Sequence, residues 1–322
     1  MVDAPVVPVG SAAALRRPAL GYAMVLAAAT LFAVNGIVSK VILASGISSL
    51  RLTEVRLTGA ALGLLGTLAL VRPSSLRLHR RELPFLVAFG IGGVALVQWL
   101  YFFAIHRLPI GIALLIQYLA PLIVALWARF VMHRPVRRRI WLALALALSG
   151  LALVVQIWER GTLDALGVTA ALGAAASFSF YILSAERGVA ERDAVSLTCY
   201  GFLFGALFFA VLQPWWSFPA DVVGDRSSLL GNLSSSTAPV WALMLWMVVM
   251  GTIVPFGLFV AALAHVPATR ASIVAMFEPV VAIVVAWSWL GEELAAVQLA
   301  GAAIVLAGIV LAQTAREPRT GS

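Results

Sequence analysis

The segment "ASIVAMFEPVVAIVVAW", residues 271–287, contains a single acidic residue, Glu278, followed directly by Pro279. If the apolar span that contains this segment, residues 268–290, crosses a membrane, Glu278 lies about ten residues from either end, or ~15 Å, which is too deep for its side chain to reach water. A charged carboxyl group at that depth should therefore face the interior of a helical bundle, be paired or carry a proton. A group of this kind suits a site that takes up and releases a proton.

The proline beside the acid gives Glu278 a structural alternative. Pro279 has no N–H group, so the carbonyl group of Ala275 loses its helical partner, and a protonated Glu278 could satisfy it. Pro121 breaks an earlier apolar segment in the same way, but it follows Ala120 and not an acid. We hypothesise that both prolines are helix breaks at mid-membrane and that only the second is chemically active.

Other side chains inside apolar segments are also candidates for binding. Arg56, in "TEVRLTGAAL", could bind a carboxylate through two hydrogen bonds, or could extend outward to the membrane surface. The alternative to substrate binding for the uncharged candidates is a structural role, in which they hydrogen-bond or pack between helices. These candidates are Asn35, Gln98, Tyr101, Gln117, Tyr118, Ser177, Tyr181 and Thr252. Gln117 and Tyr118 are the strongest of these because they lie next to Pro121.

The composition explains why these residues should lie within a membrane. Of 322 residues, 62% are hydrophobic and only 11% are charged, whereas a soluble domain is about a quarter charged. Apolar stretches near the ~20 residues that a membrane-spanning helix needs recur along the chain. We predict ten of them, at residues 20–43, 48–71, 84–106, 109–130, 139–158, 165–185, 194–213, 238–264, 268–290 and 295–314.

The distribution of the basic residues predicts the orientation of these spans. If residues 1–19 and 315–322 form cytoplasmic tails, 16 of the 22 Arg and Lys residues fall on the cytoplasmic side. Cytoplasmic loops of membrane proteins are enriched in these residues. The net charge of +8 is therefore assigned to orientation in a cytoplasmic (inner) membrane, and nucleic acid is excluded as a partner.

An internal repeat relates the two halves of the chain, at residues 20–158 and 165–314. A constant offset of 158 residues matches Pro109 with Pro267, Pro121 with Pro279, and Gly150 with Gly308. Five spans, an odd number, separate the two copies, so the copies face opposite ways in the membrane. Inverted repeats are typical of secondary transporters, which bind their substrate near the midplane where the halves meet.

Three stretches of the chain show a recognisable pattern: "RLPIGIALLIQYLAPLIVALWARFV", "VRLTGAALGLL" and "HVPATRASIVAMFEPVVAIVVAWSWLGEELAAVQLAGAAIVLAGIVLAQ". Through these stretches the chain resembles the EamA-type family of the drug/metabolite transporter (DMT) superfamily. The resemblance implies an all-α membrane protein of ten helices in two inverted five-helix repeats, which moves a small metabolite by alternating access. Within this family, export of amino acids or related amphipathic solutes is the leading expectation. The first half departs from the family pattern, with "MHRPVRRR" where Gly-Glu is frequent.

Several alternatives stay open at this point. Uptake and uncoupled facilitation are compatible with the same fold, and both a monomer and a homodimer are compatible with the sequence. A membrane-embedded enzyme is a more remote alternative, because the sequence contains no H-E-x-x-H, no G-x-S-x-G and no P-loop motif. A channel is equally remote, because an inverted repeat with one central acid fits alternating access better than an ion filter. We expect no cofactor and no metal. The expected partners are a small solute, the lipid bilayer and, if transport is coupled, protons.

Overall fold

A computed structural model describes residues 17–105, 107–108, 110–156, 158 and 164–314. The predicted tails lie almost entirely outside these residues. Within them, ten helical spans are long and apolar enough to cross a membrane, which confirms the predicted number and the all-α fold.

The spans and their parts follow the chain in order. Five spans are single helices: α1 (Pro18–Ala44), α2 (Ser49–Val71), α7 (Arg138–Val155), α9 (Ala194–Leu212) and α14 (Ala296–Thr314). A sixth single helix, α8 (Ala165–Glu191), is the longest together with α1. The composite spans are α3 (Leu83–Ala88), η2 (Phe89–Ala95) and α4 (Leu96–Ile105); α5 (Ile110–Gln117) and α6 (Ala120–Phe130); α10 (Val240–Val248), η7 (Val249–Ile253) and α11 (Val254–Ala262); α12 (Ala268–Ala275), α13 (Phe277–Val285) and η8 (Ala286–Leu290).

The sixth span is longer than the sequence predicted. The prediction ended it at residue 185, where charged residues begin, but α8 continues to Glu191. The reason is that Glu186 has partners at that depth: its carboxylate accepts a hydrogen bond from the Ala268 N–H (3.0 Å) and pairs with Arg134 (3.3 Å). The chain then turns directly into α9, because the Asp193 side chain accepts a hydrogen bond from the Ser196 N–H and caps that helix.

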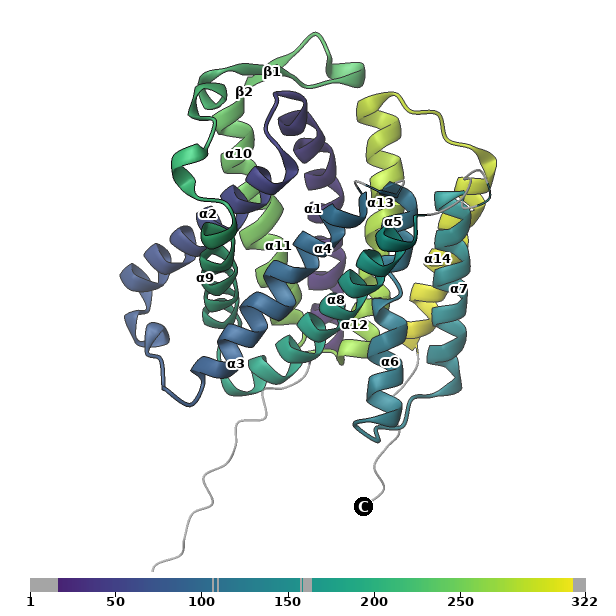
Figure 1. The fold of residues 1–322 in the computed structure, drawn as a ribbon. Helices are drawn as coiled ribbons and strands as arrows, with labels where there is room; N and C mark the ends of the chain where they lie inside the picture. The colour runs from purple at the N-terminus through teal and green to yellow at the C-terminus, as the bar shows by residue number, and fades with distance from the viewer. Residues whose placement is uncertain (1–16, 106, 109, 157, 159–163, 315–322) are drawn as a thin grey trace, which may run out of the picture.

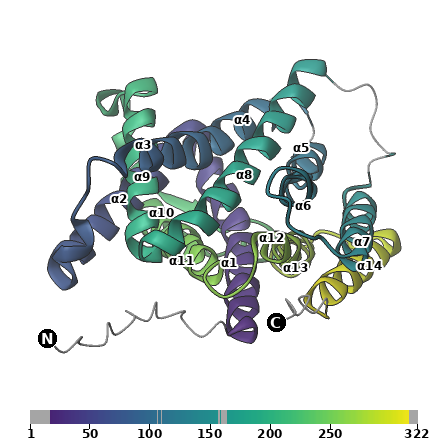
Figure 2. The ribbon, with the colours of Figure 1, turned by 90° about the horizontal axis from the view of Figure 1, so that it is seen from below.

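The packing follows a pseudo-two-fold arrangement of the two halves. In the first half, α1 packs against α11 and the α12–α13 pair of the second half, while α8 packs in the same way against α4 and the α5–α6 pair. The helices α2 and α9 pack on each other, as do α7 and α14. In Figure 2, α7 and α14 lie at one edge of the bundle and α2 at the opposite edge. The inverted repeat therefore accounts for which helices are neighbours.

Small residues allow the close contact between α7 and α14, the most extensive in the molecule. A Cβ atom added at Gly150 would lie 2.6 Å from the carbonyl oxygen of Gly301, and one added at Gly301 would lie 2.6 Å from that of Gly150. The two backbones touch at this point, as is usual where small residues line an interface between membrane helices.

The irregular parts of the helices also repeat at the offset of 158. The fourth span is interrupted at Tyr118–Leu119, between α5 and α6, and the ninth at Met276, between α12 and α13. The π-helix η2 ends at Ala95 in the third span and the π-helix η7 ends at Ile253 in the eighth. Such π-segments frequently mark functional sites. The breaks and π-segments therefore belong to the repeated backbone.

One end of the bundle carries a long connection between α9 and α10. It contains η4 (Trp215–Ser217), η5 (Ala220–Gly224), η6 (Gly231–Leu233) and an antiparallel pair of strands, β1 (Arg226–Ser228) and β2 (Thr237–Pro239). We call residues 226–239 the strap. It lies at the top of Figure 1, across the ends of α1 and α10. Another short helix, η1 (Pro73–Leu76), follows α2 in the loop to α3.

Candidate functional site

Glu278 lies in the first turn of α13, directly after the break in the ninth span. The helix α12 ends at Ala275, where the Pro279 ring removes the next helical hydrogen bond. The break turns the N-terminal end of α13 into the middle of the bundle, and a helix N-terminus favours a negative group. The Glu278 side chain is half-buried and not fully enclosed. It therefore has room to meet a solute within the membrane.

A small cavity accounts for this partial exposure. Its volume is about 50 Å³, and its walls come from the first, fourth, sixth, eighth and ninth spans. The residues that line it are mostly apolar or aromatic: Val25, Ala29, Phe32, Tyr118, Phe178, Tyr181, Phe256, Phe259, Ala275 and Glu278. Glu278 is the one acid among them, so the cavity combines aromatic faces with a single carboxyl group.

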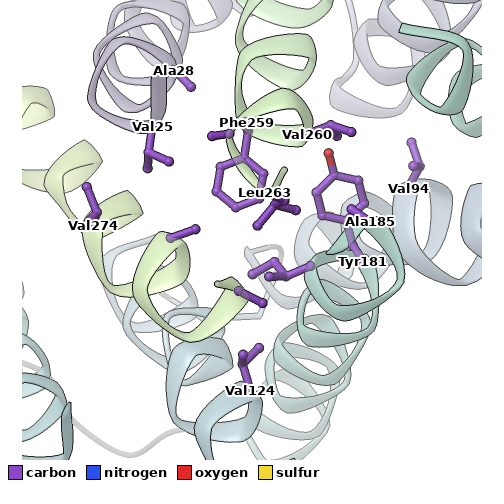
Figure 3. Packing of buried hydrophobic residues seen from close by; sticks show 14 of the residues in the cluster. Val25, Ala28, Val94, Val124, Tyr181, Ala185, Phe259, Val260, Leu263 and Val274 are labelled. Carbon is purple, nitrogen blue, oxygen red and sulfur yellow. The ribbon is translucent and has the colours of Figure 1, made fainter. Parts of the chain in front are cut away.

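The aromatic rings around the cavity hold one another in place. The Tyr181 ring stacks on that of Phe259 with 6.2 Å between centroids and meets that of Phe256 edge-on at 5.8 Å. Phe256 in turn packs edge-on against Phe32 at 5.0 Å. Figure 3 shows Tyr181, Phe259 and Val25 converging from α8, α11 and α1. These rings form a preorganised wall, and the Tyr181 hydroxyl group has no hydrogen-bond partner in the described part of the chain.

The first half of the chain contributes a polar group that faces the acid. Tyr118 lies in the break of the fourth span, is 5% exposed, and lines the same cavity as Glu278. Tyr101, on α4, lies near enough to the same carboxyl group for an electrostatic interaction with it. The two broken helices therefore meet through their side chains at the centre of the bundle.

Arg56 approaches the same region from α2. Its Nε donates a hydrogen bond to the Thr252 hydroxyl oxygen (3.2 Å), and that hydroxyl group donates to the Met247 carbonyl oxygen (2.8 Å). Arg56 and Glu278 are close enough for their charges to interact, although no direct ion pair between them is found among the described residues. The two terminal nitrogens of Arg56 make no hydrogen bond within the described part of the chain, which leaves that edge available to an anion.

The remaining predicted residues divide into two groups. Ser177 donates a hydrogen bond to the Gly92 carbonyl oxygen in η2, so its hydroxyl group joins two helices. Asn35 packs against Gly251 of η7. The side chains of Asn35, Gln98 and Gln117 each contain a buried polar atom without a hydrogen-bond partner in the described structure. These three are polar groups close to the breaks and π-segments, but they do not line the cavity.

Sequence reasoning missed most of the cavity wall. Phe32, Phe178, Phe256 and Phe259 carry no polar signal, and helical spacing alone does not distinguish a cavity wall from a packed core. Sequence reasoning also gave no role to Arg51, in the first turn of α2. In the structure Arg51 is 9% exposed, pairs with Glu54 (2.6 Å) and donates to the Pro214 carbonyl oxygen (3.2 Å). A spacing of three residues on a helix was the available signal for this pair.

The comparisons with known proteins place this arrangement in a family. The sequence profile of the EamA-like transporter family matches residues 19–156 and again residues 165–314. The chain belongs to the EamA-like transporter family. It is therefore a membrane transporter and not an enzyme, as the sequence predicted. Among the described residues, no group of three or more His, Cys, Asp or Glu side chains is placed to hold a metal ion.

Individual EamA-like relatives extend the comparison. The threonine/homoserine exporter RhtA of Escherichia coli (strain K12) is 29% identical over 271 residues, which cover 82% of this chain and 80% of that protein. The uncharacterized inner membrane transporter YicL of Salmonella typhimurium (strain LT2) is 25% identical and covers 90% of this chain and 94% of its own. A solved crystal structure superimposes with a TM-score of 0.74 at 15% identity, over 91% of this chain and 96% of that one. The last match shows the fold alone.

Proposed function

We propose that this protein exports small neutral amino acids across a cytoplasmic membrane by alternating access. The observation that carries the proposal is the acid Glu278 in an aromatic cavity at the centre of the bundle, with Arg56 close enough for its charge to act on that acid. An amino acid is a zwitterion, and it presents one anionic and one cationic group at a fixed short separation. The names of the threonine/homoserine exporters support the same substrate class.

Glu278 and the aromatic wall suit the ammonium group of such a substrate. A carboxylate supplies the opposite charge, and the faces of tyrosine and phenylalanine rings attract cations. Tyr118, Tyr181 and Phe256 all line the cavity with Glu278. This combination favours a cation over an anion at this end of the site.

Arg56 suits the carboxylate group. The hydrogen bond from Nε to Thr252 fixes the guanidinium group and leaves its terminal nitrogens for a substrate. Two parallel N–H groups of arginine match the two oxygens of a carboxylate. Because Arg56 and Glu278 do not pair directly, a zwitterion between them would give each side chain a partner of opposite charge.

Glu278 is also the group that we propose for proton coupling. A single carboxyl group at this depth can hold a proton or pair with an ammonium group, but it cannot do both at once. Binding of a proton and binding of an amino acid are then mutually exclusive, and each half-cycle carries one or the other. That exchange would couple export of the amino acid to the inward movement of a proton down its gradient.

The cavity volume indicates that this structure is a closed state of the cycle. About 50 Å³ holds a few water molecules, whereas ligand pockets usually exceed ~300 Å³. Substrate would enter when the bundle opens toward one side, and the breaks at Tyr118–Leu119 and Met276 are the places where helices can bend.

We also propose on which side of the membrane the two termini lie, and where the two repeats begin and end. The excess of arginine on one side supports cytoplasmic termini, residues 1–19 and 315–322, and an inner-membrane location. The two repeats are assigned to residues 20–158 and 165–314.

Counterflow in proteoliposomes tests the proposal. Vesicles with wild-type protein are loaded with unlabelled threonine or homoserine, and accumulation of the labelled compound is followed with and without a pH gradient. We expect a saturable signal that a pH gradient stimulates, and loss of that stimulation in Glu278→Gln. The matched control is Glu191→Gln, an exposed acid at the end of α8. A saturable signal that ignores the gradient and persists in Glu278→Gln would instead identify an uncoupled facilitator with a structural acid.

A further inference from the structure

Each end of the bundle carries an ion pair that joins one half of the chain to the other. At the strap end, Lys40 Nζ lies 3.2 Å from Glu292 Oε1, so that α1 is tied to the segment that follows the ninth span. At the opposite end, a terminal nitrogen of Arg134 lies 3.3 Å from Glu186 Oε2. That contact ties α8 to the segment that follows the fourth span.

The two ion pairs occupy similar positions in the inverted repeat, and one partner of each pair is equivalent. Glu292 and Arg134 are 158 residues apart, the same offset as the two prolines. The helices α1 and α8 both contain 27 residues, and when their starts are aligned Lys40 matches Arg187, so Glu186 lies one residue before the position that matches Lys40. A similar cross-connection is therefore built twice, with opposite charges at the equivalent positions 292 and 134.

The backbone at the two positions confirms that the segments are equivalent. Gly291, before Glu292, has φ of +72°, and His133, before Arg134, has φ of +53°. Both residues lie in the left-handed region, where glycine is common and histidine is more frequent than most other residues. The "MHRPVRRR" loop thus keeps the shape of the "LGEEL" segment although its charge is opposite.

The strap explains why only one of these two positions is a glycine. A Cβ atom at Gly291 would lie 2.8 Å from the Asn232 side-chain oxygen, because the strap is packed against it. At the other end no strap is present, and the exposed His133 side chain folds back toward the Val131 carbonyl oxygen (3.0 Å). The difference in residue type follows from what covers each end.

These ion pairs lie at opposite ends of the membrane spans. The helices α1 and α8 are five spans apart, so their C-terminal ends face opposite sides, as Figure 1 shows. In alternating access the bundle opens at one side at a time. The helix pair that each ion pair joins, α1 with the ninth span and α8 with the fourth, also lines the central cavity. Opening at either end must therefore separate one pair.

We propose that Lys40–Glu292 and Arg134–Glu186 are the two alternating gates of this transporter. Both are closed in this structure, and one breaks in each half-cycle while the other stays formed. The inference rests on the family and on the repeat, and it does not depend on which solute is carried.

The strength of the pairs suits this role. The side chains of Lys40 and Glu292 are 57% and 54% exposed, and those of Arg134 and Glu186 are 57% and 19% exposed. Ion pairs in such positions are weak enough to be broken by thermal motion. Further hydrogen bonds support each closed state: the Trp289 indole N–H donates to the Leu229 carbonyl oxygen (2.8 Å) at the strap end, and the Glu186 carboxylate accepts from the Ala268 N–H at the other.

Accessibility of the cavity from each side tests the proposal without a known substrate. The natural Cys199 is replaced by alanine, and one cysteine is introduced in the cavity wall by Ala29→Cys or, as a second reporter, Ala275→Cys. A membrane-impermeant thiol reagent is applied from each side in turn. We expect Lys40→Glu to raise the labelling rate from the strap end by about five-fold, the upper range for an exposed ion pair, and to lower it from the other end.

Arg134→Glu should produce the opposite pattern, with faster labelling from the end away from the strap. Double variants that exchange the charges, Lys40→Glu with Glu292→Lys and Arg134→Glu with Glu186→Arg, should return toward the wild-type rates. The matched control is Arg187→Glu, which reverses a charge next to Glu186 but affects only a loose contact with Glu191 (3.9 Å). The proposal is overturned if both single variants change labelling from the same side, if neither changes it, or if Arg187→Glu reproduces the effect of Arg134→Glu. Failure of amino-acid transport alone would leave it intact.

Discussion

The broken helices of the fourth and ninth spans have the same backbone and different chemistry. In both, the helix is interrupted just before a proline, at positions 158 residues apart. At the break itself Tyr118 corresponds to Met276, and before the proline Ala120 corresponds to Glu278. One half thus contributes a hydroxyl group and the other an acid to the same site. A symmetric scaffold holds an asymmetric pair of side chains.

The residues that surround the two breaks also differ in polarity. In the first half, the Ser179 hydroxyl group on α8 lies within hydrogen-bonding distance of the carbonyl oxygens of Ala175 (2.7 Å) and Ala120 (3.2 Å), so a polar side chain of a neighbouring helix lies beside the break. With α1 and α8 aligned by their starts, Phe32 takes the place of Ser179 beside the second break. Phe32 cannot supply a hydrogen bond, and it lines the cavity instead. The polar contact beside the first break therefore has an apolar counterpart beside the second.

The strongest test of this comparison moves the acid to the other half. The double variant Glu278→Ala with Ala120→Glu keeps the composition but places the carboxyl group at a fully buried position outside the cavity. We expect transport to fall by up to about 100-fold, because the ammonium group of the substrate loses its charged partner and a hydrogen bond to a charged group contributes about 1.5–3 kcal/mol. Counterflow in proteoliposomes measures the loss, with thermal stability as the control for folding. Wild-type transport in the double variant would show that the two breaks are interchangeable.

A second test examines whether the first half also supplies the anion-binding group. Arg56→Gln should raise the KM for an amino acid by roughly 10- to 100-fold, since a hydrogen bond to a charged group contributes about 1.5–3 kcal/mol. The corresponding amino-acid amide lacks the carboxylate, and it should bind wild type and variant equally weakly. Competition assays with both compounds check this. An equal loss of affinity for acid and amide would point to a structural role for Arg56.

A third test concerns positions at which the two halves should behave alike. A Cβ atom at Gly150 would lie 2.6 Å from a carbonyl oxygen, and one at Gly308 would lie 2.8 Å from the Ala143 carbonyl oxygen. Gly150→Ala and Gly308→Ala should each reduce stability by about 1–3 kcal/mol through overpacking. Gly36→Ala is the control, because no atom lies within 4 Å of the added carbon. Thermal unfolding in detergent measures all three, and a difference of several kcal/mol between Gly150→Ala and Gly308→Ala would contradict the symmetric packing.

The smallest expected effect comes from the hydroxyl group that faces the acid. Tyr118→Phe removes one hydrogen-bonding group and keeps the aromatic wall, so transport should fall by about 2- to 10-fold, in line with 0.5–1.5 kcal/mol for a single hydrogen bond. Tyr200→Phe is the matched control, because that hydroxyl group donates to the Leu76 carbonyl oxygen (2.8 Å) far from the cavity. The response to a pH gradient should change in Tyr118→Phe alone, and an identical response in both variants would remove Tyr118 from the site.

The sequence by itself determined the class, the number of spans and the inverted repeat. These follow from hydrophobic length and from the spacing of prolines and glycines, which depend on the local backbone and on the bilayer and not on tertiary contacts. The depth of Glu278 also followed from counting residues, because the rise of a helix is fixed. Arg56 and Tyr118 were identified because they are polar side chains inside apolar membrane spans. Nothing in their spacing showed that both approach Glu278.

Only the tertiary structure decided which side chains meet. The aromatic wall of Phe32, Phe256 and Phe259 comes from spans that are distant in the chain, and their residues look like ordinary core in sequence. The cross-connections Lys40–Glu292 and Arg134–Glu186 join residues 252 and 52 positions apart. The sequence alone does not reveal their symmetry, because Glu292 corresponds to Arg134 and Gly291 corresponds to His133. Side-chain identity can diverge between repeats while the backbone conserves its shape, since packing constrains the backbone of both halves in the same way.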